Sequence, residues 1–271
     1  MNISVTQIIS SSPIGIFDSG VGGLTVFKEV RRALPLEDIV YLGDTARVPY
    51  GTKSVDVVKK YSKQNVEFLL SMGVKTIVVA CNTASAASIT YLNDIFRDVY
   101  IIGVIDPVVE HIKNNLSIKK VGVIGTATTI ESNAYQNAIR KYIPDVKIFS
   151  KACPLFVPLV EEGLFEDKIT EIAIDMYLSA MKNENIDAII LGCTHYPMLK
   201  LAIERYFEKR VKVLDTALHT ALTLKDELTN KNLLNLCGLG KERFYVTDSI
   251  TTFKKTAEMF LGFNINDISH I

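Results

Sequence analysis

The sequence has no net charge, because 30 lysine and arginine residues balance 30 aspartate and glutamate residues. A dedicated nucleic-acid binder normally carries an excess of basic residues on one face, so we expect no nucleic-acid partner. Runs of like charge long enough to form an interaction tail are also missing.

Long apolar runs are missing as well. No uninterrupted apolar stretch approaches the roughly 18 residues that a membrane span needs. The N-terminal stretch "MNISVTQIISSS" lacks a basic start, and its apolar part is short and interrupted, so we do not expect a signal peptide or an anchor. The expectation is a cytoplasmic protein with no membrane partner.

Cysteines are few and widely spaced, at positions 81, 153, 193 and 237, without a Cys-x-x-Cys or a zinc-type cluster. A cytoplasmic chain of 271 residues, 48% of them hydrophobic, can bury one large core or two modest ones and needs no disulfides. Each cysteine is by default a buried filler of the core.

Apolar β-rich runs alternate with helical patterns along nearly the whole chain. Examples are "PIGIFD", "KTIVVA" and "DAIILG", with helices expected at about 54–72 and 128–142. The runs lack alternation between apolar and polar residues, which is typical of parallel sheets covered on both faces. The pattern predicts an α/β protein.

Two pairs of segments repeat at nearly the same offset: "IGIFDS" resembles "VGVIGT", and "TIVVACNT" resembles "AIILGCTH". This repeat predicts two pseudo-symmetric open parallel-sheet domains, with the active site in the cleft between them. We expect residues 1–98 together with 211–271 to form the first lobe and 99–210 the second.

Polar residues follow the strands at the edge where open parallel sheets bind ligands. They are Asp18-Ser19, Cys81-Asn82-Thr83, Gly125-Thr126 and Cys193-Thr194-His195. Each group precedes a helix, whose N-terminal N–H groups suit a small anion and lower the pKa of a nearby thiol.

Two thiols that flank one carbon atom can invert it, because one removes a proton from one face and the other delivers a proton to the opposite face. If the two lobes face each other, Cys81 and Cys193 approach a shared cleft in this way. Asp18 and His195 are the natural assistants, one on each side, and a protonated His195 favours a Cys193 thiolate. The two sides are therefore expected to be chemically unequal.

Other interpretations apply to each residue alone. Either cysteine could be inert, Asp18 could belong to a turn, and Asn82 could merely cap a helix. The glycines of "SGVGG" do not follow the G-x-G-x-x-G pattern, so a dinucleotide site is weakly indicated.

Taken together, the motifs resemble those of the cofactor-independent aspartate/glutamate racemase family, and in particular its glutamate-specific members. The matching stretches, which cover about residues 14–247, are "GIFDSGVGGLTV", "YLGDTARVPYGTKS", "VVACNTASA", "GVIGT", "ACPLFVPLVEEG", "LGCTHYP" and "FYVTD".

The resemblance implies interconversion of L- and D-glutamate without a cofactor or metal, D-glutamate supply for peptidoglycan, cell wall and cell shape, and a homodimer. It implies Cys81 and Cys193 as the catalytic acid/bases, assisted by Asp18 and His195. It also implies substrate contacts from Asp18, Ser19, Tyr50, Gly51, Asn82, Thr83, Thr126, Thr194 and His195, and a position near Cys193 for a glutamate of "LVEEG", with Glu161 favoured over Glu162. One departure from the family pattern is Asp106-Pro107-Val108-Val109, which bears on local packing and substrate access.

Three alternatives stay open at this point. The substrate could be aspartate or another acidic amino acid, because one methylene changes binding by only about 1 to 3 kcal/mol. The protein could be a two-lobed ligand-binding module with structural thiols. It could also be a thiol redox or metal protein.

Overall fold

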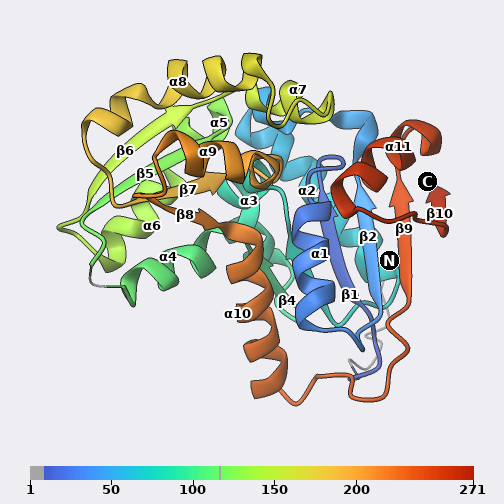
Figure 1. Ribbon diagram of the computed structural model, residues 1–271. Coiled ribbons are helices and arrows are strands. Elements are labelled where there is room, and N and C mark those ends of the chain that lie inside the picture. The colour runs from blue at the N-terminus through green and yellow to red at the C-terminus, as the bar shows by residue number, and fades with distance from the viewer. Residues whose placement is uncertain (1–8, 116) are drawn as a thin grey trace.

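The chain folds into two parallel-sheet lobes in this computed structural model, which describes residues 9–115 and 117–271 (Figure 1). Most of the N-terminal stretch that we expect not to be a leader lies outside the described residues. Of the helices in the described ranges, none combines the length and the apolar character needed to cross a membrane.

The first lobe is built on a six-stranded parallel sheet with the order β10-β9-β2-β1-β3-β4. Its strands are β1 (Ile14–Asp18), β2 (Ile39–Gly43), β3 (Thr76–Val79), β4 (Tyr100–Gly103), β9 (Glu242–Val246) and β10 (Ile268–His270).

The second lobe is built on a four-stranded parallel sheet with the order β6-β5-β7-β8. Its strands are β5 (Lys120–Gly125), β6 (Lys147–Ala152), β7 (Ala188–Gly192) and β8 (Lys212–Asp215). This order reproduces β2-β1-β3-β4 of the first sheet, with the repeated segments at equivalent places. The α/β class and the pseudo-symmetric pair of sheets predicted from the repeat are confirmed.

Helices cover both faces of each sheet, as the absence of polar alternation predicts. The helices are α1 (Leu24–Ala33), α2 (Val55–Ser71), α3 (Asn82–Ile95), α4 (Ile105–Lys113), α5 (Ala127–Glu131), α6 (Ala134–Tyr142), α7 (Phe156–Glu161), α8 (Lys168–Asn183), α9 (Lys200–Tyr206), α10 (Thr216–Asn230) and α11 (Ile250–Leu261), with short 3₁₀ turns at Thr45–Arg47, Tyr50–Thr52 and Tyr196–Leu199.

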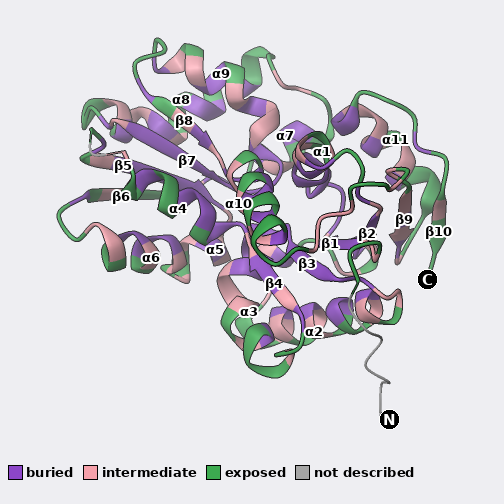
Figure 2. Cartoon of the chain, turned by 90° about the horizontal axis from the view of Figure 1, so that it is seen from below, coloured by how far each residue is buried: buried purple, intermediate pink, exposed green. Residues whose placement is uncertain are grey.

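Alternate residues of each strand belong to different clusters of the core. In β3, Val78 packs in the cluster that contains α1, α10 and α11, whereas Ile77 and Val79 pack with α2 and α3. The first of these clusters continues into the second lobe, through β7 to α7, α8 and α9. Figure 2 shows the central strands of both lobes buried among helices whose outer faces are exposed, whereas the edge strand β10 is mostly exposed. This shared core holds the two lobes against each other.

The chain crosses between the sheets later than the sequence suggests. β4 pairs with β3 in the first sheet, and β8 pairs with β7 in the second. The expected crossings at 98–99 and 210–211 are therefore corrected to positions after Gly103 and after Asp215. The error has a physical cause: each crossing runs from a strand into a helix with at most one residue between them, so no linker composition marks it.

The region 128–142 holds two helices rather than one. Asn133 has a φ of 55° between α5 and α6, a left-handed conformation that asparagine tolerates better than most residues. The departure at 106–109 lies in the first half of α4, where Val108 and Val109 are fully buried against the second sheet. It therefore contributes to packing, and none of its residues lines the cavity described next.

Candidate active site

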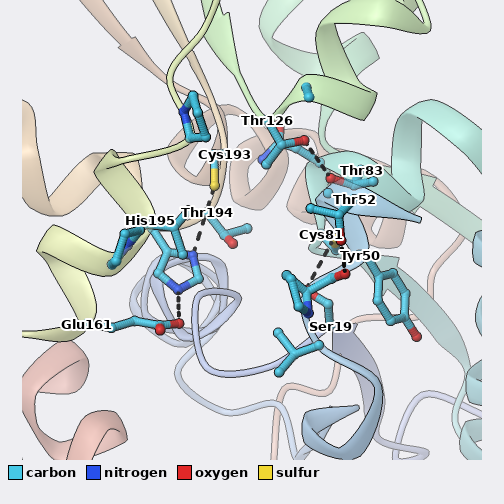
Figure 3. Close-up of a pocket in the computed structure, with 18 residues that line it drawn as sticks. Ser19, Tyr50, Thr52, Cys81, Thr83, Thr126, Glu161, Cys193, Thr194 and His195 are labelled. Atoms are coloured by element: carbon cyan, nitrogen blue, oxygen red, sulfur yellow. Dashed lines mark hydrogen bonds and ion pairs between the residues drawn. The ribbon is translucent and has the colours of Figure 1, made fainter. Parts of the chain in front are cut away.

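A cavity of about 310 Å³ lies between the carboxyl ends of the two sheets (Figure 3). All the residues predicted from the sequence line it except Asp18, and Glu161 lines it as well. Cys81 and Cys193 come from β3 and β7, which are equivalent strands of the two lobes. The structure thus places both thiols on the wall of one cavity.

Cys81 caps the N-terminus of α3. Its Sγ accepts a hydrogen bond from the N–H of Ala84 at 3.5 Å and lies 3.7 Å from Ser19 Oγ. Burial, and to a smaller extent the charge of Asp18, raise the pKa of the Cys81 thiol to about 12, although the Ala84 and Ser19 contacts oppose the rise. The sequence-based expectation of a lowered thiol pKa is wrong for Cys81, because loss of solvent outweighs these weak bonds to sulfur.

Cys193 faces a buried histidine. His195 Nδ1 lies 3.9 Å from Cys193 Sγ, and its Nε2 lies 3.0 Å from Glu161 Oε1. Burial alone lowers the pKa of His195, but the hydrogen bonds to Cys193 and Glu161 and the charges of Cys193 and Asp18 raise it to about 10. The imidazole is therefore protonated at neutral pH, and it places a positive charge 3.9 Å from the sulfur of Cys193.

Asp18 lies beneath the cavity rather than on its wall. Its carboxyl group is fully buried and accepts hydrogen bonds from the N–H of Gly20 at 2.9 Å and the hydroxyl of Thr194 at 3.4 Å. Burial raises its pKa, although the His195 charge and the hydrogen bonds oppose the rise. Asp18 is the last residue of β1 in the first lobe, and its hydrogen bond from Thr194 links that strand to the Cys193 motif of the second lobe.

Three threonine hydroxyls meet across the lobes. Thr83 Oγ1 lies 3.0 Å from Thr126 Oγ1 and 3.3 Å from Thr129 Oγ1, and the last two are 2.9 Å apart. Sequence reasoning missed Thr129, which is fully buried. Its position three residues after Thr126, on the first turn of a helix, is the signal that could have found it.

Tyr50 and Gly51 join the lobes at the cavity. The Tyr50 hydroxyl donates to Asp44, and the hydroxyl of Thr128 donates to the Gly51 carbonyl oxygen at 2.7 Å. A Cβ on residue 51 would lie 2.8 Å from Thr126 Cβ, so only glycine allows this approach. The "YG" dipeptide is therefore a contact between lobes as well as a turn.

Gly22 allows a close approach between the lobes. A Cβ there would lie 2.4 Å from both His195 Nδ1 and Thr194 Oγ1. In addition, the hydroxyl of Thr25 donates to the Thr194 carbonyl oxygen at 2.9 Å. The sequence analysis considered "SGVGG" only as a phosphate-binding loop. Its packing against the Cys193 motif was not predicted, because no residue near position 22 indicates a contact with residues 194 and 195.

The remaining cysteines lie away from the cavity. Cys153 is fully buried, and burial raises the pKa of its thiol to about 12, while the Lys151 charge opposes the rise. Cys237 is exposed. Neither lines the cavity that contains Cys81 and Cys193.

Comparison with known families agrees with this geometry. The model of the Asp/Glu/Hydantoin racemase family matches residues 18–223. This range spans most of the chain and includes both cysteine motifs. The chain belongs to this family and is an amino-acid racemase, an isomerase.

Glutamate racemases are among the relatives of the chain. The one from Persephonella marina is 46% identical over 93% of this chain and 95% of its own length. The crystal structure of the Francisella tularensis glutamate racemase in complex with D-glutamate has a TM-score of 0.92 and 41% identity, covering 97% of this chain and 98% of that one. The Thermus thermophilus glutamate racemase in complex with β-chloro-D-alanine has a TM-score of 0.88 and 44% identity, with the same coverage.

Proposed function

We propose that the chain interconverts L- and D-glutamate without a cofactor, using Cys81 and Cys193 as its two acid/base groups. The observation that carries this proposal is that thiols from equivalent strands of two pseudo-symmetric lobes line one small cavity. Two single-proton groups on opposite faces of one carbon are what an inversion requires.

The protonation states support a defined starting state. The raised pKa of Cys81 keeps it as a thiol, and the proposed starting state has the thiolate on Cys193, whose sulfur lies 3.9 Å from the protonated ring of His195. The Cys193 thiolate removes the α-proton that faces it, which breaks the C–H bond and forms an S–H bond. The Cys81 thiol then gives its proton to the opposite face and becomes the thiolate, which is the form that acts on the other enantiomer.

The negative charge that develops on the substrate needs donors that are already in place. The N-terminus of α3, the hydroxyls of Thr83 and Thr126, and the side chain of Asn82 all border the cavity. The buried Asn82 Nδ2 has no hydrogen-bond partner within the described residues. These groups suit a carboxylate whose neighbouring carbon becomes carbanion-like.

The proposed substrate is glutamate because the relatives carry that name and the Francisella enzyme holds D-glutamate. We further propose that the product supplies D-glutamate to peptidoglycan. A cytoplasmic location stays a prediction from the sequence pattern, and a homodimer stays a prediction from the family resemblance.

Purified protein is expected to bring the optical rotation of either pure glutamate enantiomer to zero with no cofactor added. In deuterated water it is expected to incorporate deuterium at the α-carbon of both enantiomers. A ligand-binding module would leave rotation and label unchanged, and a faster reaction with aspartate would overturn the substrate assignment.

The His195→Asn substitution is expected to lower kcat more in the direction that starts from the Cys193 thiolate than in the reverse direction. The physical reason is that only this side loses a positive charge 3.9 Å from sulfur. Because the equilibrium constant between enantiomers is unity, KM must compensate, and kcat/KM falls equally in both directions. Circular dichroism progress curves from each enantiomer measure both parameters; equal losses of kcat would contradict this division of roles.

A further inference from the structure

Asn82 lines the cavity and carries a buried donor that has no partner within the described residues. It is the first residue of α3, lines the cavity and is only 2% exposed. Its Oδ1 accepts a hydrogen bond from the hydroxyl of Tyr135, whereas its Nδ2 has no partner within the described residues. Buried N–H groups are rarely left without an acceptor in native proteins, so the Nδ2 group indicates a place for a ligand oxygen.

The hydroxyl of Tyr135 determines whether Oδ1 or Nδ2 of the Asn82 side chain faces Tyr135. Its side chain lies in α6 of the second lobe and is fully buried in the apolar cluster that includes Ile105 and Ile139. Burial raises the pKa of Tyr135 well above its ordinary value, so the phenol keeps its proton and must donate it. Oδ1 of Asn82 is the acceptor that receives it. With a reversed amide, the phenol oxygen could only accept from Nδ2, and the phenol proton would lose the acceptor that Oδ1 provides.

We propose that Tyr135 is a positioning residue for racemisation, which holds the Asn82 amide so that Nδ2 donates to the substrate carboxylate. This inference rests on the proposed function. The two residues belong to different lobes, so the bond orients the amide only while the lobes keep their present arrangement.

The α-carboxylate is the group that Nδ2 reaches. Asn82 directly follows Cys81, whose sulfur must face the α-carbon, and the carboxylate is bonded to that carbon. Charge accumulates on the α-carboxylate as the C–H bond breaks, so a donor fixed there stabilises the transition state more than the bound substrate. Loss of its orientation is therefore expected to lower kcat more than it raises KM.

The test is a double-mutant cycle in glutamate racemisation. Tyr135→Phe is expected to lower kcat/KM about tenfold, the effect of one buried hydrogen bond, mainly through kcat. Asn82→Ala is expected to lower it about 100-fold, as loss of a transition-state donor does. The double variant is expected to match Asn82→Ala, because Tyr135 acts through Asn82. Independent, multiplied losses would overturn the proposal, and so would an unaltered Tyr135→Phe enzyme.

Asn82→Asp gives a second test that does not depend on how Tyr135→Phe folds. Aspartate keeps an oxygen to accept from Tyr135 but lacks the Nδ2 donor, so its activity is expected to fall at least as far as that of Asn82→Ala. Wild-type activity in Asn82→Asp would overturn the proposal.

Tyr196→Phe is the matched control, because Tyr196 is also fully buried but its hydroxyl donates only to the carbonyl oxygens of Gly125 and Cys153. It is expected to be less stable with kcat/KM near the wild-type value. A loss equal to that of Tyr135→Phe would overturn a specific role for Tyr135. If the wild-type protein itself did not racemise glutamate, the proposed function would fail. If the wild type were active but the losses of Tyr135→Phe and Asn82→Ala multiplied in the double variant, only the role of Tyr135 would be refuted.

Discussion

Replacing either Cys81 or Cys193 with alanine is expected to lower glutamate racemisation by about 10⁴-fold or more, the upper range for loss of a general acid or base. Each thiol serves one face of the substrate carbon, so the remaining thiol cannot complete the inversion. Both cysteines are almost fully buried, and alanine removes only one sulfur atom from each site. Racemisation is measured by polarimetry, and folding by thermal unfolding and circular dichroism.

Cys153→Ala and Cys237→Ala are the controls. Cys153 is as buried as the two cavity cysteines but does not line the cavity, so its variant reports on the cost of losing a buried thiol. Both controls are expected to keep their activity. Substantial interconversion by purified Cys81→Ala or Cys193→Ala would refute the two-base assignment.

Gly22→Ala is expected to lower kcat/KM about 100-fold, because displacement of a catalytic group by about 1 Å has effects of this size. The new methyl group would lie 2.4 Å from His195 Nδ1 and from Thr194 Oγ1. Movement of the His195 ring away from this methyl group is opposed by its hydrogen bond to Glu161. The ring also packs edge-to-face on Phe260, with 5.5 Å between ring centroids. The substitution therefore separates the lobes or turns the imidazole away from Cys193.

Gly20→Ala is the matched control for this prediction. It lies in the same loop, but the nearest atom to its Cβ would be Val48 Cγ2 at 3.5 Å, which is an ordinary contact. Its kinetics and unfolding temperature are expected to stay near those of the wild type. Equal losses in the two variants would show that the loop itself, rather than the approach of His195, is sensitive.

Much of the fold could be predicted from the sequence because its strongest signals are local. The strands β1, β3, β5 and β7 are continuous apolar runs that are buried on both faces, and each ends in polar residues. The edge strand β6 was not predicted, since most of its side chains are half-buried or exposed and do not form such a run. The crossings after Gly103 and Asp215 were also missed, because strand and helix follow each other there without a linker.

The amino-acid sequence by itself determined the α/β class, the duplicated sheets, the family resemblance and nearly all the polar residues that line the cavity, whereas most of its apolar wall, such as Val48, Pro154 and Val157, was not predicted. The predicted features are properties of short segments, whose periodicity and end residues can be read along the chain. Only the tertiary structure decided the contacts made across the two lobes. They include the need for glycine at position 22, the bond from Tyr135 to Asn82 and the meeting of Thr129 with Thr83. The raised pKa values of Cys81 and His195 depend on the same packing, because burial and the approach of distant charges are set by the whole fold.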